Sequence, residues 1–247
     1  MKIQTVKIKG WGKLVNLVSA FLLIGIGFVY LYPILYMAVV SVMPTSDLIN
    51  PTIQWLPTAL DFGSFSLVSN IMEYPKTLVN TLLLASVCAA VSTLVCCLVG
   101  YALARYPVPR KKLWTFILLL VFIIPADVVA VPRYVLFTQF HLVGSFLSVL
   151  LPASFGQGLK SSLCILLFMQ SFSSYPKSYD EAAELDGAGH GKIFLRIAVP
   201  MAVPVIVLTF LLSFIWYWNE TSQTGMYLAG SFQTLPLKLG QFDSLYG

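Results

Sequence analysis

The stretch TLVNTLLLASVCAAVSTLVCCLVGYALA, residues 77–104, is 28 residues long and contains no charged side chain. A helix needs about 20 predominantly apolar residues to cross a bilayer. Two other runs are comparable, with 30 uncharged residues at 14–43 and 23 at 197–219. These runs predict an all-α, polytopic helical membrane protein.

The composition excludes an ordinary soluble domain. Hydrophobic residues make up 58% of the 247-residue chain and charged residues only 10%, against roughly 25% charged residues in soluble domains. A single soluble core of this size could not bury so much apolar surface.

Five membrane spans are predicted, at about 14–42, 77–104, 113–136, 152–172 and 199–219. The first is too long for the apolar region of a signal peptide, about 7–15 residues, so we expect it to be retained. The fourth is interrupted by Gly156, Gly158 and Lys160. This interruption predicts an irregular or water-lined start to that span.

The basic residues predict the orientation. With a cytoplasmic N-terminus, the inner segments hold Lys2, Lys7, Lys9, Lys13, Arg105, Arg110, Lys111, Lys112, Lys177, Lys192 and Arg196, and the outer segments hold Lys76, Arg133 and Lys238. This excess follows the positive-inside rule, so the net charge of +5 indicates topology and no nucleic-acid partner. The predicted parts are a cytoplasmic N-terminus (1–13), the first span (14–43), an extracytoplasmic loop (44–76), a core (77–220) with a cytoplasmic loop (173–199), and an extracytoplasmic segment (221–247).

The sequence offers no catalytic or metal-binding pattern. Cys88, Cys96, Cys97 and Cys164 all lie inside apolar runs and are spaced neither as a zinc site nor as a disulfide framework. The two histidines fall on opposite predicted sides of the membrane, which disfavours a membrane enzyme. We therefore expect no cofactor on this chain.

The segment YDEAAELDGAGHGKIFLRIAVP, residues 179–200, is unusually polar for this chain. Ser178 and Glu181 fit a capping box, and Gly187 and Gly189 are natural terminators, so a helix is predicted at about 179–186. Its alanines give a flat face, shared by Tyr179, Ala182, Ala183 and Asp186. A helix this short is marginal in isolation and needs a partner surface.

Three interpretations of this segment compete. The first is a solvated loop with ordinary capping. The second is a nucleotide site at GAGHGK (187–192), but a P-loop needs glycine at position 186 and serine or threonine at position 193, where the chain has Asp186 and Ile193. The third is a docking helix for a soluble partner.

The docking interpretation is supported by a resemblance to the EAA motif of membrane subunits of ATP-binding-cassette importers. That motif reads E-A-A, three residues, G, nine residues, I-x-L-P. Here Glu181-Ala182-Ala183 is followed by Gly187 and by Ile197-Ala198-Val199-Pro200, with Val199 in place of leucine. The stretches NTLLLAS (80–86), PKSYDEAAELDGAG (176–189) and WYWNE (216–220) resemble the carbohydrate-uptake branch, similar to the smaller permease of the maltose type, and the similarity covers about 14–247.

The resemblance implies a type I importer permease fold in a bacterial or archaeal plasma membrane. It implies a second permease that forms a heterodimer with this chain, an extracytoplasmic sugar-binding protein, and two ATPase subunits that carry ATP and Mg²⁺. The resemblance thus implies that this chain is no enzyme. The residues implied to dock the ATPase are Tyr179, Asp180, Glu181, Ala182, Ala183, Leu185, Asp186, Gly187 and Ala188. The family usually has six spans, and we expect the last span to be missing from this chain.

Lys160, Trp216, Trp218 and Asn219 are candidates for contact with a transported sugar. The alternatives are snorkelling for the lysine and an interfacial aromatic belt for the tryptophans. Arg133 and His141 are open to the same two interpretations, contact with a sugar or a water-filled path and ordinary snorkelling or pairing. The alternative function is an ion-coupled secondary transporter, which would need acidic residues inside the bilayer. Asp127 is the one candidate near a span interior.

Overall fold

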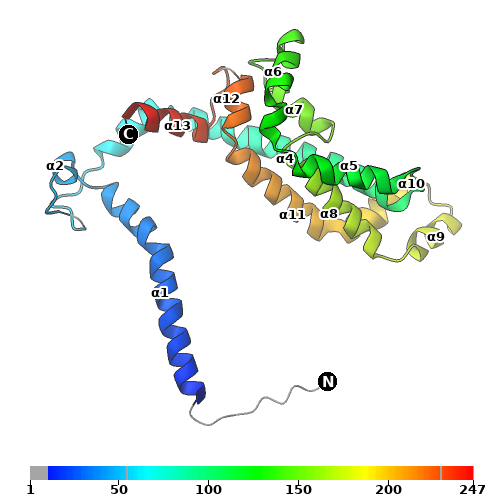
Figure 1. Ribbon diagram of the computed structural model, residues 1–247, viewed down its shortest axis with the longest axis horizontal. Helices are drawn as coiled ribbons and strands as arrows, with labels where there is room; N and C mark the ends of the chain where they lie inside the picture. The colour runs from blue at the N-terminus through cyan, green and yellow to red at the C-terminus, as the bar shows by residue number, and fades with distance from the viewer. Residues whose placement is uncertain (1–10, 54, 229, 247) are drawn as a thin grey trace. The chain divides into compact units, whose positions relative to one another are not determined.

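The computed structural model describes residues 11–53, 55–228 and 230–246, and all regular structure in these ranges is helical (Figure 1). The chain divides into two compact units, residues 1–71 and 72–247. Helix propensity and long apolar runs account for the class, because backbone polar groups in a bilayer must be satisfied within each segment.

The first unit contains α1 (Trp11–Val40), α2 (Thr45–Leu48) and α3 (Gly63–Ile71). Helix α1 holds the predicted first span, shifted about three residues toward the N-terminus. After it, the buried Asp47 accepts hydrogen bonds from the backbone N–H of Thr58 at 2.7 Å and from its hydroxyl at 2.9 Å. This carboxylate fixes the chain between α2 and α3.

The second unit is built on α4 (Tyr74–Arg105), which packs against α8 (Ser161–Ser174) and α11 (Val199–Trp218) (Figure 1). Small residues allow α4 and α8 to come close. A Cβ placed on Gly100 would lie 2.5 Å from Phe168 Cβ and 3.0 Å from the backbone nitrogen of Met169. Close packing through small side chains is the usual way that membrane helices associate.

The predicted third span is not one straight helix. It comprises α5 (Lys111–Ile123), the 3₁₀ turn η1 (Ala126–Val129) and α6 (Ala130–Gln139), with a bend of 90° at the break. Pro125 lies at the break in extended backbone and N-caps η1, where its missing N–H and fixed φ disfavour a continuing helix. The predicted third span at 113–136 is therefore a bent pair of helices and not one continuous helix.

The predicted fourth span is also divided. Helix α7 (Leu147–Ser154) ends before the glycines, and α8 begins only at Ser161. Gly156 and Lys160 both have positive φ, +68° and +49°. The irregular segment is confirmed, but the span does not begin as a helix at residue 152 and continue to 172.

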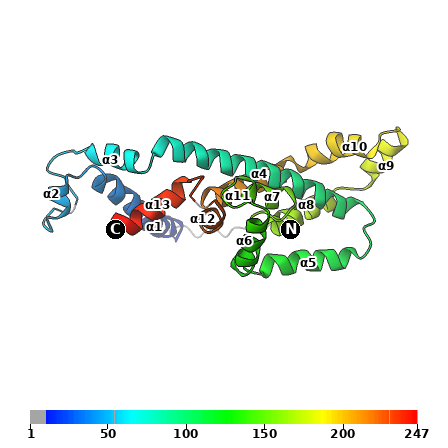
Figure 2. The ribbon, with the colours of Figure 1, turned by 90° about the horizontal axis from the view of Figure 1, so that it is seen from above.

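The chain after α8 forms α9 (Ser178–Leu185), α10 (His190–Ile193), the π turn η2 (Phe194–Ala198) and α11. Two helices that the sequence did not predict follow, α12 (Ser222–Leu228) and α13 (Leu235–Tyr246). The chain at the start of α13 bonds to the first turns of α4, because Asn80 Nδ2 donates to Gln233 O at 3.0 Å and Leu235 N–H donates to Thr81 Oγ1 at 2.7 Å. Figure 2 shows α12 and α13 near one end of α4 and α9 near the other.

Within the described ranges, three helical segments are long and apolar enough to cross a membrane, at Gly12–Val40, Tyr74–Arg105 and His190–Trp218. A fourth is added if the bent pair at Lys111–Ile123 and Asp127–Gln139 counts as one span, and α8 is a shorter apolar helix. The predicted spans at 113–136 and 152–172 have no single helix of this length, because each contains a break.

Glu220 provides a pH-dependent contribution to stability at the start of α12, where its carboxylate accepts the N–H of Gln223 at 2.7 Å. Burial raises the pKa of Glu220 above its ordinary 4.5, and the hydrogen bonds from the Gln223 and Ser222 backbone oppose this shift. The folded chain therefore binds this proton more tightly than the unfolded chain. The resulting stabilisation is complete below about pH 4.5 and is lost as the pH rises through the folded pKa.

Glu220→Gln keeps the acceptor oxygen and removes the charge. We expect its melting temperature at about pH 7.5 to exceed that of the unchanged chain by about 2 °C, and the two proteins to melt alike at about pH 4. Circular dichroism in mild detergent measures this. Glu73→Gln is the control, because ion pairing with Lys76 lowers the pKa of Glu73. No gain for Glu220→Gln at neutral pH would contradict the prediction.

Candidate functional site

The polar segment between α8 and α11 contains the predicted short helix, observed as α9 at Ser178–Leu185. The predicted capping box is wrong. Lys177 occupies the N-cap position in helical conformation, no side chain caps the helix, and Ser178 is already its first residue. The helix starts early because Lys177 O accepts the N–H groups of both Asp180 and Glu181, which leaves the serine hydroxyl inside the first turn.

Gly187 ends α9 in the way its sequence position predicts. Its φ is +78°. The N–H of Gly187 donates to Glu184 O and that of Ala188 donates to Ala183 O, both at 2.9 Å, which is the Schellman pattern. Gly189 does not terminate the helix as predicted. It lies in extended backbone and is the N-cap residue of α10.

The two sides of α9 differ in exposure. Tyr179 is 52% exposed and Leu185 is 90% exposed, and Ala182 and Asp186 are exposed beside them. Ala183 and Ala188 are half-buried. The small-residue face that the sequence singled out is therefore largely uncovered, and Leu185 adds an apolar side chain to it.

Asp180 is on the opposite side and turns toward α4. Its carboxylate Oδ2 lies 3.3 Å from Arg105 Nε, and the side chains of Arg105 and Asp180 are only 5% and 16% exposed. The same guanidinium lies over the ring of Tyr175, 3.4 Å from its centroid, and its Nη2 donates to Tyr175 O at 3.2 Å. Burial raises the pKa of the Tyr175 phenol, an effect that the Arg105 charge opposes and the Asp180 carboxylate reinforces.

A charged pocket of about 250 Å³ lies between the end of α4, α9 and α10. Its lining residues are Tyr101, Arg105, Tyr106, Pro107, Lys177, Asp180, Glu181, Glu184, His190 and Ile193. His190 Nδ1 lies 3.8 Å from Glu184 Oε1, with both side chains mostly exposed. Glu181, a predicted docking residue, therefore borders this pocket, whereas Ala182, Leu185 and Asp186 do not line it.

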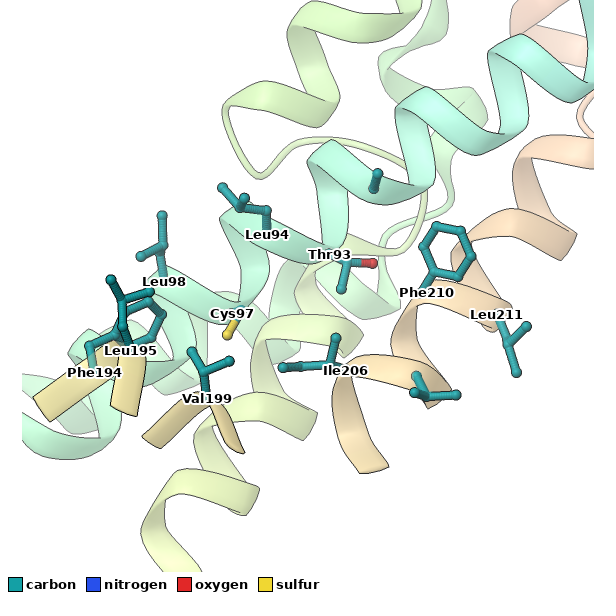
Figure 3. A pocket seen from close by; sticks show the side chains of 12 residues that line it. Thr93, Leu94, Cys97, Leu98, Phe194, Leu195, Val199, Ile206, Phe210 and Leu211 are labelled. Carbon is teal, nitrogen blue, oxygen red and sulfur yellow. The ribbon is translucent and has the colours of Figure 1, made fainter. Parts of the chain in front are cut away.

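A second hollow, an apolar groove of about 540 Å³, lies between α4 and the start of α11 (Figure 3). Leu94, Cys97, Val199 and Ile206 project into it, and Thr93 supplies the hydroxyl group on its wall. A polar solute needs several directed hydrogen-bonding groups to replace water. The groove does not provide them, so it is not a candidate site for such a solute.

The structure brings together two of the four candidate substrate contacts. Lys160 Nζ lies 4.8 Å from the ring centroid of Trp216. Trp218 instead packs against Phe214 at 5.8 Å between centroids, and Asn219 Nδ2 donates to Ile215 O of its own helix at 2.8 Å. Substrate contact by these residues stays a prediction.

Two important residues were missed from the sequence. Tyr217 is buried, and its hydroxyl accepts the N–H of Leu159 at 3.2 Å, which holds the irregular segment before α8 against α11. Arg105 was counted only as a basic residue near the membrane. A cation that closes an uncharged run of 28 residues, just before the proline-containing turn, was the available signal for a special role.

The described residues include no group of three or more His, Cys, Asp or Glu placed to hold a metal ion. What the geometry does provide is a helical membrane protein with long apolar spans and a short, largely uncovered helix beyond the end of α4. This combination is that of a polytopic helical membrane protein with an open face on a short helix outside its spans.

The comparisons with known proteins agree with that class. Residues 97–246 match the family model for the binding-protein-dependent transport system inner membrane component, and the chain belongs to this family. A probable ABC transporter permease protein of Pyrococcus horikoshii is 31% identical, over 88% of this chain and 80% of the relative. The diacetylchitobiose uptake system permease of Streptomyces coelicolor is 27% identical, over 94% and 82%.

A solved structure has the same fold. A chain of a bacterial ABC transporter that imports the acidic polysaccharide alginate superposes with a TM-score of 0.82 at 21% identity, covering 98% of this chain and 84% of that chain. The type I importer permease fold implied by the EAA-like segment is thereby confirmed.

Proposed function

We propose that this chain is one of two permease subunits of an ATP-driven, binding-protein-dependent importer of sugars or oligosaccharides. The second permease forms the other half of the translocation path. Two separate ATPase subunits carry ATP and Mg²⁺, and an extracytoplasmic binding protein delivers the solute. The chain lies in a bacterial or archaeal plasma membrane with its N-terminus in the cytoplasm.

The observation that carries this proposal is the uncovered face of α9. Exposed Ala182 offers close approach, and exposed Tyr179 and Leu185 offer apolar contact. An eight-residue helix with no buried residue gains little stability from its own hydrogen bonds. A partner cleft that receives this face would stabilise it.

The proposed mechanism is a two-state switch. ATP binding draws the two ATPase subunits together, and each displaces the coupling helix α9 seated on it. The paired permeases then change from inward-facing to outward-facing. A ligand can drive such a change only through its different affinity for the two states, and rigid-body rearrangement about packed interfaces is a common form of it.

A saccharide as the solute is supported by the similarity to the diacetylchitobiose uptake permease of Streptomyces coelicolor and to the alginate transporter. Lys160 and Trp216 are proposed to line the path. An aromatic face suits the apolar face of a sugar ring, and an ammonium group can donate hydrogen bonds to its hydroxyls.

Purification of the chain from its native membrane with an affinity tag tests the proposal. We expect a second permease and a soluble ATPase to co-purify in fixed ratio. Reconstituted with the binding protein, the complex should take up labelled oligosaccharide only when ATP is supplied. Uptake by the lone chain in a proton gradient, without an ATPase, would instead establish a secondary transporter.

A further inference from the structure

Helix α9 has few attachments to the membrane helices. None of its residues is fully buried, and its short-range neighbour is α10, which follows it in the chain. Within the described part of the chain, the ion pair that joins it to a membrane helix is the one between Asp180 and Arg105. This contact is therefore well placed to transmit a displacement of α9.

Arg105 belongs to a helix that is well packed within the second unit. It is the last residue of α4, whose length of 32 residues packs against both α8 and α11. A positive charge at this end also complements the helix dipole. The opposite end of α4 bonds to the chain at the start of α13 through Asn80 and Thr81. A force applied to Arg105 thus acts on a helix that contacts most of the second unit.

The guanidinium engages the chain on both sides of the α8–α9 junction. It bonds the carbonyl of Tyr175 before α9 and pairs with Asp180 within α9. Its flat face lies on the Tyr175 ring, a contact that a lysine cannot reproduce. The ion pair is buried, so it is little weakened by solvent screening, unlike surface pairs.

We propose that Arg105 is a positioning residue that transmits the movement of α9 to α4. This inference rests on the proposed function, because it presumes that a partner ATPase moves α9. The buried Arg105 Nε and Asp180 Oδ1 make no hydrogen bond within the described chain, although the pair is within ionic contact. Because no hydrogen bond fixes these two atoms, a small rotation of α9 would change the distance and angle between the guanidinium and the carboxylate. The pair could then have one arrangement in each of the two transport states.

The test uses the reconstituted complex with its ATPase, partner permease and binding protein. Arg105→Met and Asp180→Asn each remove one charge, and Lys112→Met is the control because Lys112 is an exposed cation on the neighbouring helix α5. Three quantities are measured: the amount of ATPase that co-purifies, the rate of ATP hydrolysis, and the solute transported per ATP hydrolysed.

We expect both variants to retain the ATPase, because the Asp180 side chain is mostly buried against Arg105 and the uncovered face of α9 is unchanged. Solute transported per ATP should fall at least about fivefold, as loss of a typical coupling free energy predicts. Lys112→Met should match the unchanged complex. Arg105→Lys should retain less than half of the normal ratio, because charge alone does not replace the planar contacts. If Arg105→Met does not insert, Asp180→Asn carries the test.

Two results would overturn the inference. One is a normal transport-to-hydrolysis ratio in both charge-removing variants. The other is loss of the ATPase from both variants, since Arg105 would then only shape the docking surface. Failure of the proposed function itself is distinguishable, because the unchanged chain would then purify without any ATPase.

Discussion

Replacing Gly100 with leucine is expected to prevent the packing of α4 against α8. A Cβ at this position would lie 2.5 Å from Phe168 Cβ, 3.0 Å from Met169 N and 3.1 Å from Ile165 O. Two of these atoms belong to the backbone of α8, so they can move away only if the helices separate. The expected destabilisation is about 3 kcal/mol or more, at the upper end of overpacking costs.

The measurement is the yield of monodisperse protein in mild detergent, followed by thermal unfolding. Gly27→Leu is the matched control, because a Cβ on Gly27 would meet nothing within 4 Å. We expect Gly100→Leu to aggregate or to melt far below the unchanged chain, and the control to behave normally. Equal melting temperatures for the two variants would contradict the close approach of α4 and α8.

Replacing Gly187 with valine is expected to lower ATP-driven uptake about tenfold while the chain remains inserted. The φ of +78° at Gly187 is unfavourable for any residue with a Cβ, by roughly 1–2 kcal/mol, and tenfold corresponds to about 1.4 kcal/mol. No atom lies within 4 Å of the added Cβ. The effect therefore comes from the backbone, which must give up the Schellman bonds that end α9 and thus change the surface offered to the ATPase.

Gly191→Val is the control for this experiment. Gly191 lies in α10 without a positive φ, and its added Cβ also meets nothing within 4 Å. Uptake is measured in proteoliposomes, and insertion is checked by the yield of folded protein. Normal uptake by Gly187→Val would show that the exact end of α9 is unimportant for coupling.

The sequence predicted the helices that are marked by a long, continuous uncharged run. Residues 14–43, 77–104 and 197–219 correspond to α1, α4 and α11 because an uncharged run of that length has few other stable forms in a bilayer. The helices that contain breaks were harder to predict from hydropathy. The run at 113–136 is apolar throughout its first half, so hydropathy did not reveal the bend near Pro125. The tail after residue 220 is too polar to span, and the start of α13 is held by bonds to Asn80 and Thr81, far away in sequence.

The local features of the candidate site were also predictable, and its long-range contacts were not. The existence of α9 and the turn at Gly187 follow from local composition. The role of Ser178 was mistaken because a capping pattern does not specify the residue at which the first turn begins. The pairing of Arg105 with Asp180 spans 75 positions, and nothing in the spacing of either residue predicts it. Only the packing of α4 beside α8 brings them together.

The run of helix from His190 to Trp218 is continuous through the π turn. Helices bend most readily at π turns and at prolines, and this run has both, at Phe194–Ala198 and at Pro204. A displacement of the loop can therefore be taken up as a change of bend near the proposed cytoplasmic end of α11, while the remainder of the helix stays packed against α4.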